Sequence, residues 1–329
     1  MENNFIIDLR KQMVDLNNIV IDGFCTLFGK KYKEKIIEII SGINVTFFAH
    51  NLSIDEIDEK LKEYPYNSYY LTLREKKKNN IDNFMLLDMP VYDEETKYEA
   101  KQFLSYNKMI KGEAVSRNDI FLVISENAKI HLRTYLHEIM HLLMIESLAI
   151  YNNKDILVTD GFISTTADSY HLLNEWFVEY LSIEVYYYIL DNYDLSDNKF
   201  INFQFFKSNY LMIDDMLNNL GERIFELFKK NLIEHFINGN ARLIIKIIGV
   251  KEIKEIDRLG DIIIEKIFME DSEKEYNKIF TIEELHMFKE NAEKIFKKVE
   301  KNYMEYLEVC RLEDEYVTKL EENGVVRRV

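Results

Sequence analysis

The first 42 residues show apolar side chains at helical spacing. From Asp8 onward these side chains recur three or four positions apart, which places them on one face of a helix. The residues on this face are Leu16, Ile19, Val20, Ile36, Ile37 and Ile40. Glycine interrupts such a pattern, so breaks are expected at Gly23, Gly29 and Gly42. The chain is therefore predicted to open with amphipathic helices.

The pattern then changes to runs rich in β-branched and aromatic residues. These runs are NVTFFAH at 44–50, NSYYLTLR at 67–74 and DNFMLLD at 82–88, with the charged helical stretch IDEIDEKLKEY at 54–64 between the first two. A further apolar run, DIFLVIS, follows at 119–125. Runs of this composition favour strands. We therefore expect a small mixed sheet in the N-terminal part of the chain.

Two apolar helices are expected in the middle of the chain. Ser125 is a suitable N-cap, and the residues after it carry a buried helical face as far as about residue 150. A polar connection that holds Asp160 and Gly161 leads to a second apolar helix at about 170–190. From about residue 203 to residue 323 the pattern is helical nearly throughout.

The composition agrees with a helical protein. Of the 329 residues 47% are hydrophobic, and two prolines and 10 glycines leave little material for long linkers or for the turns of a β-sandwich. At about 150 residues per domain, the length corresponds to roughly two domains or lobes. We predict an α+β, predominantly helical protein with an N-terminal lobe at 1–150 and a helical C-terminal lobe at 151–329.

The net charge disfavours two classes of partner. With 42 basic and 58 acidic residues the formal charge is −16, so the electrostatic field of the molecule repels nucleic-acid phosphates and anionic lipids. Neither a secretory signal nor an apolar stretch of about 18 residues is apparent. Cys25 and Cys310 lie far apart in the sequence, which favours two reduced thiols and a cytoplasmic location.

The segment His137-Glu138-Ile139-Met140-His141 is the most informative chemical motif. Two histidines four positions apart lie one turn apart on one helix face, so both imidazoles can reach a single zinc ion. Glu138, beside the first histidine, stands where a general base could contact a zinc-bound water. The alternative is two histidines on the polar rim of a core helix, paired with neighbouring acids.

A second motif reduces the weight of that alternative. A catalytic zinc needs a third protein ligand, and the second apolar helix contains the sequence NEWFVEYLS at 174–182. Glu175 and Glu179 share one face of this helix, four positions apart. Two carboxylates among large apolar side chains are costly to bury without a cation or hydrogen-bond donors. A zinc ion and its histidines would supply both.

The pair of motifs, HEIMH and NEWFVEYLS with Glu175 34 residues beyond His141, resembles the gluzincin metallopeptidases. In this thermolysin-like class, HExxH is followed on a later helix by NExxxD or NExxxE. The likeness is to the bacterial type whose second motif reads NEGxxEYLS. Trp176 stands where those relatives often have glycine, and this departure affects the shape of the adjoining pocket rather than the metal ligands.

The resemblance implies a role for each matching residue. His137, His141 and Glu175 would be the zinc ligands, and Glu138 the general base. Glu179 would accept a hydrogen bond from a ligand histidine and so fix its tautomer. The implied fold is a two-lobed zincin-like fold in which the zinc lies where the lobes join, at the floor of a cleft.

Other residues remain candidates for two of these roles. Asp160 or Asp168 could be the third ligand instead of Glu175, as in zinc peptidases that use aspartate. The gluzincin mechanism also needs a donor to the oxyanion of the tetrahedral intermediate. Among 21 tyrosines the candidates are Tyr170 and Tyr210, with His235 as the third choice.

The function predicted from these motifs is a zinc-dependent metallopeptidase that cleaves peptide or protein substrates through a metal-activated water. The alternative is a catalytically silent zinc-binding protein, or a helical interaction or regulatory protein, on the same fold. Glu138 separates the two because a protein that only holds zinc does not need a base beside it.

Overall fold

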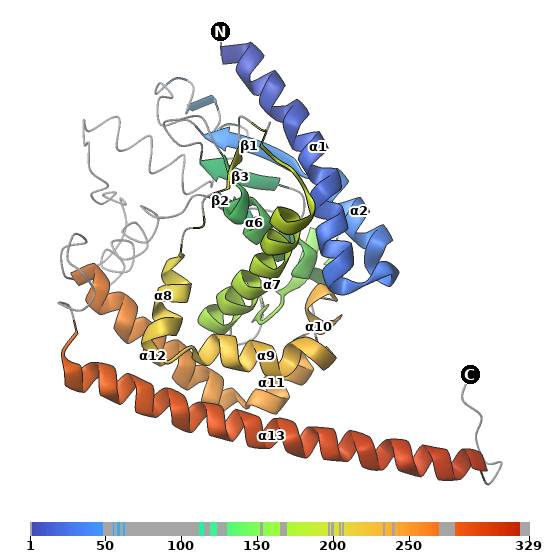
Figure 1. Cartoon of the computed structure of the whole chain (residues 1–329), viewed down its shortest axis with the longest axis vertical. Helices are drawn as coiled ribbons and strands as arrows, with labels where there is room; N and C mark the ends of the chain where they lie inside the picture. The colour runs from blue at the N-terminus through green and yellow to red at the C-terminus, as the bar shows by residue number, and fades with distance from the viewer. Residues whose placement is uncertain are drawn as a thin grey trace. The chain divides into compact units, whose positions relative to one another are not determined.

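The computed structural model is predominantly helical, which confirms the predicted class (Figure 1). It describes residues 2–48, 112–114, 119–123, 130–151, 154–164, 170–196, 201–203, 207–232, 234–238, 241–269 and 280–322, with a few single positions between them. None of the helices in these ranges is both long enough and apolar enough to cross a bilayer. The runs at 67–74 and 82–88, Ser125 and Asp168 lie outside the described residues.

The chain divides into two compact units. Unit 1 consists of Met1–Leu142, Ser182–Phe206 and Ile264–Lys274, and unit 2 of Leu143–Leu181, Lys207–Ile263 and Glu275–Val329. The division after Leu142 falls within helix α6 (Leu132–Met144) and the division after Leu181 within helix α7 (His171–Asn192), so each of these helices contributes to both units. The predicted domains, 1–150 and 151–329, stay a prediction.

Unit 1 opens with the predicted amphipathic helices. Helix α1 (Glu2–Phe28) is followed by the short 3-10 helix η1 (Lys30–Tyr32) and by α2 (Lys33–Ser41). The break predicted at Gly23 is wrong, because this glycine lies inside α1 against the C-terminal half of α7. A Cβ at Gly23 would lie 2.8 Å from Val185 Cγ1, so the glycine permits this close helix contact.

Three short strands of unit 1 pair in the order β1-β3-β2. Strand β1 (Asn44–Phe48) is parallel to β3 (Asp119–Val123), with Asn44 opposite Asp119. Strand β2 (Gly112–Ala114) is antiparallel to β3, with Gly112 opposite Leu122. A further two-residue strand, β4 (Ile130–His131), is parallel to β8 (Ile201–Asn202).

The helix expected to extend to about residue 150 is shorter than predicted. It ends at Met144, and β5 (Ile145–Tyr151) and β6 (Lys154–Asp160) follow as an antiparallel pair, with β7 (Ile163–Ser164) on the far side of β6. A short apolar run can form either a helix or a strand. Here the ladder between β5 and β6 satisfies the backbone hydrogen-bonding groups of both runs. A helix that continued to residue 150 would leave residues 154–160 without this partner strand.

The second apolar helix, expected at 170–190, is confirmed as α7. The rest of unit 2 is helical, as predicted: α8 (Asn209–Met216), α9 (Leu220–Leu232), α10 (Glu234–Ile237), α11 (Arg242–Ile248), α12 (Val250–Met269) and α13 (Ile282–Glu322). Although α12 ends in unit 1, its residues as far as Ile263 belong to unit 2.

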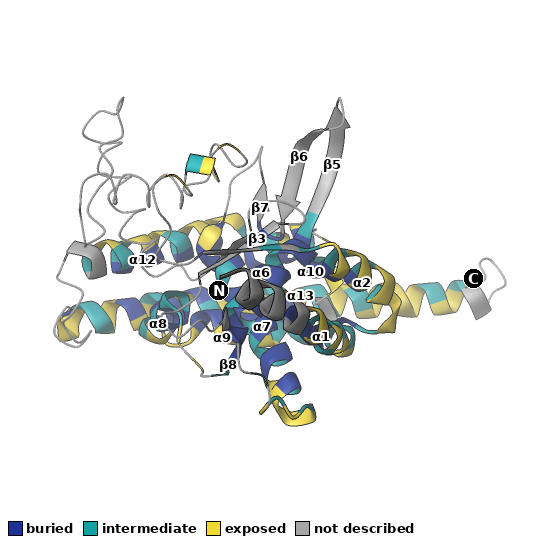
Figure 2. Ribbon diagram, turned by 90° about the horizontal axis from the view of Figure 1, so that it is seen from above, coloured by how far each residue is buried: buried dark blue, intermediate teal, exposed yellow. Residues whose placement is uncertain are grey.

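The core of unit 2 is built around the first half of α7, where most residues are buried; Figure 2 colours buried residues dark blue. Four phenylalanine rings pack there with centroids 4.5–5.5 Å apart. They are Phe162, Phe177, Phe225 and Phe236. Three of these pairs are edge-to-face and the Phe177–Phe236 pair is stacked, and aromatic pairs of both kinds add stability beyond the area that they bury. The core therefore places the first half of α7 in a rigid setting.

Candidate metal centre

Helix α6 presents two histidines beside a fully buried apolar face. That face consists of Tyr135, Leu136, Ile139, Met140 and Leu143. The Tyr135 hydroxyl donates a hydrogen bond to Asn17 Oδ1 of α1 at 2.6 Å, and burial raises the pKa of this phenol. The rotation of α6 about its axis is therefore set within unit 1 by packing and by this bond.

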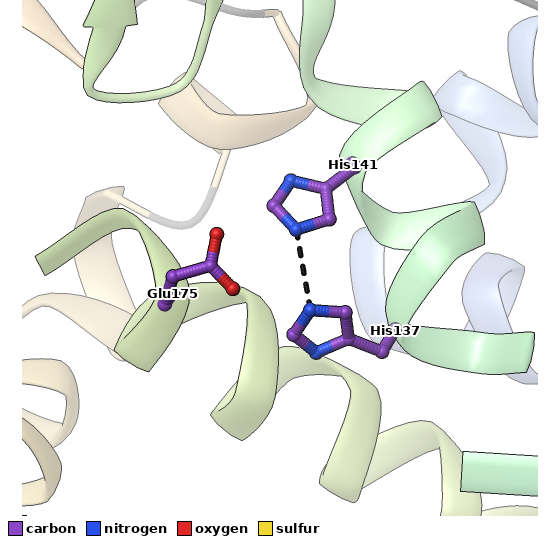
Figure 3. Close-up of side chains that lie close together, drawn as sticks. All are labelled: His137, His141 and Glu175. Carbon is purple, nitrogen blue, oxygen red and sulfur yellow. Dashed lines mark hydrogen bonds between the residues drawn. The ribbon is translucent and has the colours of Figure 1, made fainter. Parts of the chain in front are cut away.

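The histidines lie one turn apart, as their spacing predicted. His137 Nε2 and His141 Nε2 are 3.2 Å apart, and the ring centroids are 4.9 Å apart. Both side chains are at least partly buried. Each ring therefore turns the same nitrogen toward one shared point (Figure 3).

Glu175 of α7 completes a group of three. One ligand atom from each of His137, His141 and Glu175 lies within 4.8 Å of the other two. Figure 3 shows the carboxylate directed toward the pair of imidazoles. In the described part of the chain no other set of three or more histidine, cysteine, aspartate or glutamate side chains meets this closely.

The donor set fits a zinc ion in chemistry and spacing. Two imidazole nitrogens and one carboxylate oxygen are common zinc ligands, and a catalytic site holds three protein ligands. Two atoms bonded to one tetrahedral zinc at about 2.0–2.1 Å lie about 3.3–3.4 Å apart, close to the 3.2 Å between the two Nε2 atoms. A cation at this point could bind all three groups at once.

Two further carboxylates of the motifs are strongly buried. Glu138 of α6 is 7% exposed and Glu179 of α7 is 3% exposed. Burial of a carboxylate is costly unless charge or hydrogen bonds compensate it. Both side chains therefore need compensating interactions that a glutamate on the surface does not. Their predicted roles, as general base and as hydrogen-bond acceptor for a ligand histidine, stay predictions.

The other sequence candidates are spread over several elements. Tyr170 is buried and directly precedes α7, Tyr210 of α8 is partly buried, and His235 lies in the short helix α10. Asp160 is the last residue of β6, and its side chain is outside the described set. Among the described side chains, the structure brings Glu175 together with the histidines; the Asp160 and Asp168 side chains lie outside that set.

Sequence reasoning missed the residues that anchor α7. Asp257 of α12 accepts a hydrogen bond from the Leu172 backbone N–H at 3.0 Å, and Asn174 Oδ1 accepts one from the Phe162 N–H at 3.0 Å. The Tyr180 hydroxyl donates to Asp214 Oδ2 at 2.5 Å. These pairs join positions up to 85 residues apart, and no local pattern reveals such a partner.

The chain was compared with protein families, curated proteins and solved structures. No protein-family profile, curated protein or solved structure matches the chain. The likeness to gluzincins therefore depends on HEIMH, on NEWFVEYLS and on the group that these two motifs form.

Proposed function

We propose that the chain is a zinc-dependent metallopeptidase of the gluzincin type that hydrolyses peptide bonds. One observation carries the proposal: the ligand atoms of His137, His141 and Glu175 lie within 4.8 Å of one another. Glu138, next to the first histidine in the sequence, supports a catalytic role over a purely structural zinc site. The proposed substrate is a peptide or protein, and the proposed location is the cytoplasm.

The residues of the chain have distinct parts in the proposed reaction. When bound, zinc supplies Lewis acidity, which makes water acidic near neutral pH and polarises an amide carbonyl. His137 and His141 hold the ion through neutral imidazoles, and Glu175 holds it through its carboxylate. Glu138 takes the proton from the attacking water and transfers it to the leaving amine, so that one carboxylate acts first as base and then as acid.

The proposal also includes a finer description of the fold. We propose a two-lobed zincin-like arrangement, with the small sheet and the HExxH helix in the N-terminal lobe and Glu175 in the helical C-terminal lobe. The predominantly helical composition and the consecutive placement of the two motif helices support it. An experimental structure with bound zinc would test this arrangement.

The function is tested by metal analysis and by the substitution Glu138→Gln. We expect about one zinc per parent chain, and cleavage of fluorescently labelled casein that a chelator abolishes. Glu138→Gln should retain zinc and lower the cleavage rate by about 10²–10⁴-fold, because an amide cannot accept the proton of water. Glu184→Gln makes the same chemical change on α7 outside the group and should cleave at the parent rate.

Two outcomes contradict the proposal at different points. A purified chain that neither contains a transition metal nor takes up added zinc has no zinc site. A chain that binds zinc, with cleavage unchanged by Glu138→Gln, does not use Glu138 as its base. If zinc binds and no casein or peptide library is cleaved, the chain is instead the catalytically silent zinc-binding protein.

A further inference from the structure

The indole of Trp176 connects α7 to two neighbouring helices of unit 2. Its ring is fully buried, and its Nε1–H donates a hydrogen bond to the Tyr210 carbonyl oxygen of α8 at 2.9 Å. The ring also lies on Gly221 of α9, where a Cβ would approach the indole Cδ2 to 2.4 Å. The largest side chain on α7 therefore faces a position with no side chain.

The surface that receives Trp176 is itself held by several hydrogen bonds. Asp214 Oδ1 accepts a hydrogen bond from the Gly221 N–H at 2.6 Å, and Asp214 Oδ2 accepts one from the Glu222 N–H at 3.0 Å. This carboxylate therefore satisfies the first amides of α9. The Asp214 carboxylate also accepts a hydrogen bond from the Tyr180 hydroxyl of α7. Helices α8 and α9 thus contact α7 at two of its residues, Trp176 and Tyr180.

The two contacts have a defined relation to the proposed ligand. Trp176 and Tyr180 are four residues apart and form one stripe along α7. Glu175 and Glu179 form a second stripe, about 100° around the same helix. One stripe is attached to α8 and α9, and the adjacent stripe carries the carboxylate directed at His137 and His141.

The rotation of α7 about its axis matters because the tolerance of a metal site is small. A glutamate carboxylate lies roughly 6 Å from a helix axis, so a rotation of about 10° moves it by about 1 Å. Metal–ligand distances tolerate deviations of about 0.2 Å. A helix that is free to rotate would therefore leave Glu175 out of bonding range for part of the time.

We propose that Trp176, seated on Gly221 and bonded to the Tyr210 carbonyl, is a positioning residue that sets the rotation of α7 and so holds Glu175 in reach of the metal. The inference rests on the proposed function, since it needs Glu175 to be a zinc ligand. Trp176 acts through the helix and not by contact with substrate. Its effect is on the affinity and the coordination geometry of the metal.

The test compares two glycines that face α7. Gly221→Ala places a methyl group against the rigid indole. Gly260→Ala on α12 places one 2.3 Å from Leu172 Cδ2, the movable end of a side chain. We expect Gly221→Ala to weaken zinc binding by about 10–100-fold, measured by chelator competition, and to change the visible spectrum of the Co²⁺-substituted protein. Gly260→Ala should keep the parent affinity and spectrum.

A double substitution gives a second, independent measurement. Trp176→Phe removes the N–H donor and shrinks the ring, so alone it should weaken zinc binding. Combined with Gly221→Ala, the smaller ring leaves room for the new methyl group, and the loss in affinity should be less than the sum of the two single losses. Circular dichroism of each metal-free variant identifies any that fail to fold, and Trp176→Phe alone then provides the test.

The outcomes separate this inference from the proposed function. Parent-like zinc affinity and an unchanged Co²⁺ spectrum in folded Gly221→Ala, or in Trp176→Phe where Gly221→Ala does not fold, overturn the positioning role alone. Equal losses in Gly221→Ala and Gly260→Ala also overturn it, because any crowding of α7 would then have the same effect. A parent protein that binds no zinc overturns the proposed function and this inference with it.

Discussion

At the scale of single residues, the two motif glutamates of α7 differ in their surroundings. Glu175 is partly buried and supplies an atom to the group of three, whereas Glu179, one turn later, is 3% exposed and does not belong to that group. A helix turn of about 5.4 Å is large compared with a metal–ligand bond. One glutamate can therefore bind the ion while the other acts on a ligand from outside.

The first prediction separates these two roles. Glu175→Ala removes one of three protein ligands and should largely empty the zinc site. Glu179→Ala should weaken zinc binding by about 10–100-fold while leaving a site that fills at high zinc. Zinc titration of both variants, with circular dichroism to confirm folding, measures the order. If Glu179→Ala abolishes binding and Glu175→Ala does not, the ligand lies one turn further along α7; if neither matters, Asp160 or Asp168 becomes the third ligand.

The positions of the two histidines were predictable because helical periodicity alone places residues four apart on one face. Glu175 could be proposed because buried carboxylates need compensation, and the structure brings it to the histidines. The hydrogen bond from Tyr180 to Asp214 was not predictable. Its partners are 34 residues apart, and nothing in the local pattern around either residue marks the pair.

At the scale of elements, the segment after α6 is where the sequence expectation and the structure differ most. The apolar run from Ile145 continues the helical pattern, yet it forms β5 and pairs with β6. Cross-strand pairing is a long-range effect that a single run does not report. The turn that follows β6 contains Gly161 with φ +54°, in the left-handed region that favours glycine.

The second prediction concerns this turn. A Cβ at Gly161 would lie 2.1 Å from Met144 Cε, the movable end of a side chain, and 2.6 Å from Asn174 Oδ1. The Asn174 oxygen cannot move away without losing its hydrogen bond from the Phe162 N–H. Gly161→Ala should therefore lower the free energy of unfolding by about 2–4 kcal/mol, through backbone strain and the lost hydrogen bond together. Urea denaturation followed by circular dichroism measures this change.

Gly249→Ala provides a comparison in which a new Cβ meets only a movable side chain. Gly249 also has a positive φ, of +97°, but a Cβ there meets the movable carboxylate of Glu252. Because its ψ of 131° places it outside the left-handed α region, the substitution should cost backbone strain alone, on the order of 1–3 kcal/mol. A loss in Gly161→Ala of no more than about 1–2 kcal/mol, the backbone strain of the left-handed region alone, would show that the contact with Asn174 contributes nothing measurable.

At the scale of the whole molecule, the helical class follows from quantities visible in the sequence. Few glycines and prolines, long stretches at helical spacing and a well-marked apolar helix near residue 180 all indicate helices, and the structure contains them. The pairing of β1 with β3 was not predictable, because these strands are joined by about 70 residues of sequence and parallel pairing carries no local signature. Short-range periodicity therefore defines the helices. Long-range contacts determine which strands pair and which side chains hydrogen-bond to α7.

The third prediction concerns the dependence of stability on pH in the metal-free chain. Burial, with the nearby Asp261 charge adding to its effect, raises the pKa of Asp257 to about 6, although the hydrogen bond from the Leu172 N–H opposes the shift. The folded state thus holds a proton that the unfolded state, with a pKa of about 3.8, has released. The stability from this group is fully present below pH 3.8 and is lost as the pH rises through about 6.

Asp257→Asn isolates that contribution, since its amide oxygen can still accept the Leu172 N–H and carries no titrating proton. In the parent, Asp257 should make the free energy of unfolding lower at pH 7 than at pH 5 by an amount on the order of 1 kcal/mol, after discounting for its partial exposure. Urea titrations of both proteins at the two pH values, with a chelator present, measure the difference. All other titrating groups are present in both proteins. The fall in the free energy of unfolding from pH 5 to pH 7 should therefore be smaller in Asp257→Asn by the Asp257 contribution alone. An identical decline in the two proteins would show that Asp257 does not hold its proton in the folded state, and that its anchoring of α7 does not depend on pH.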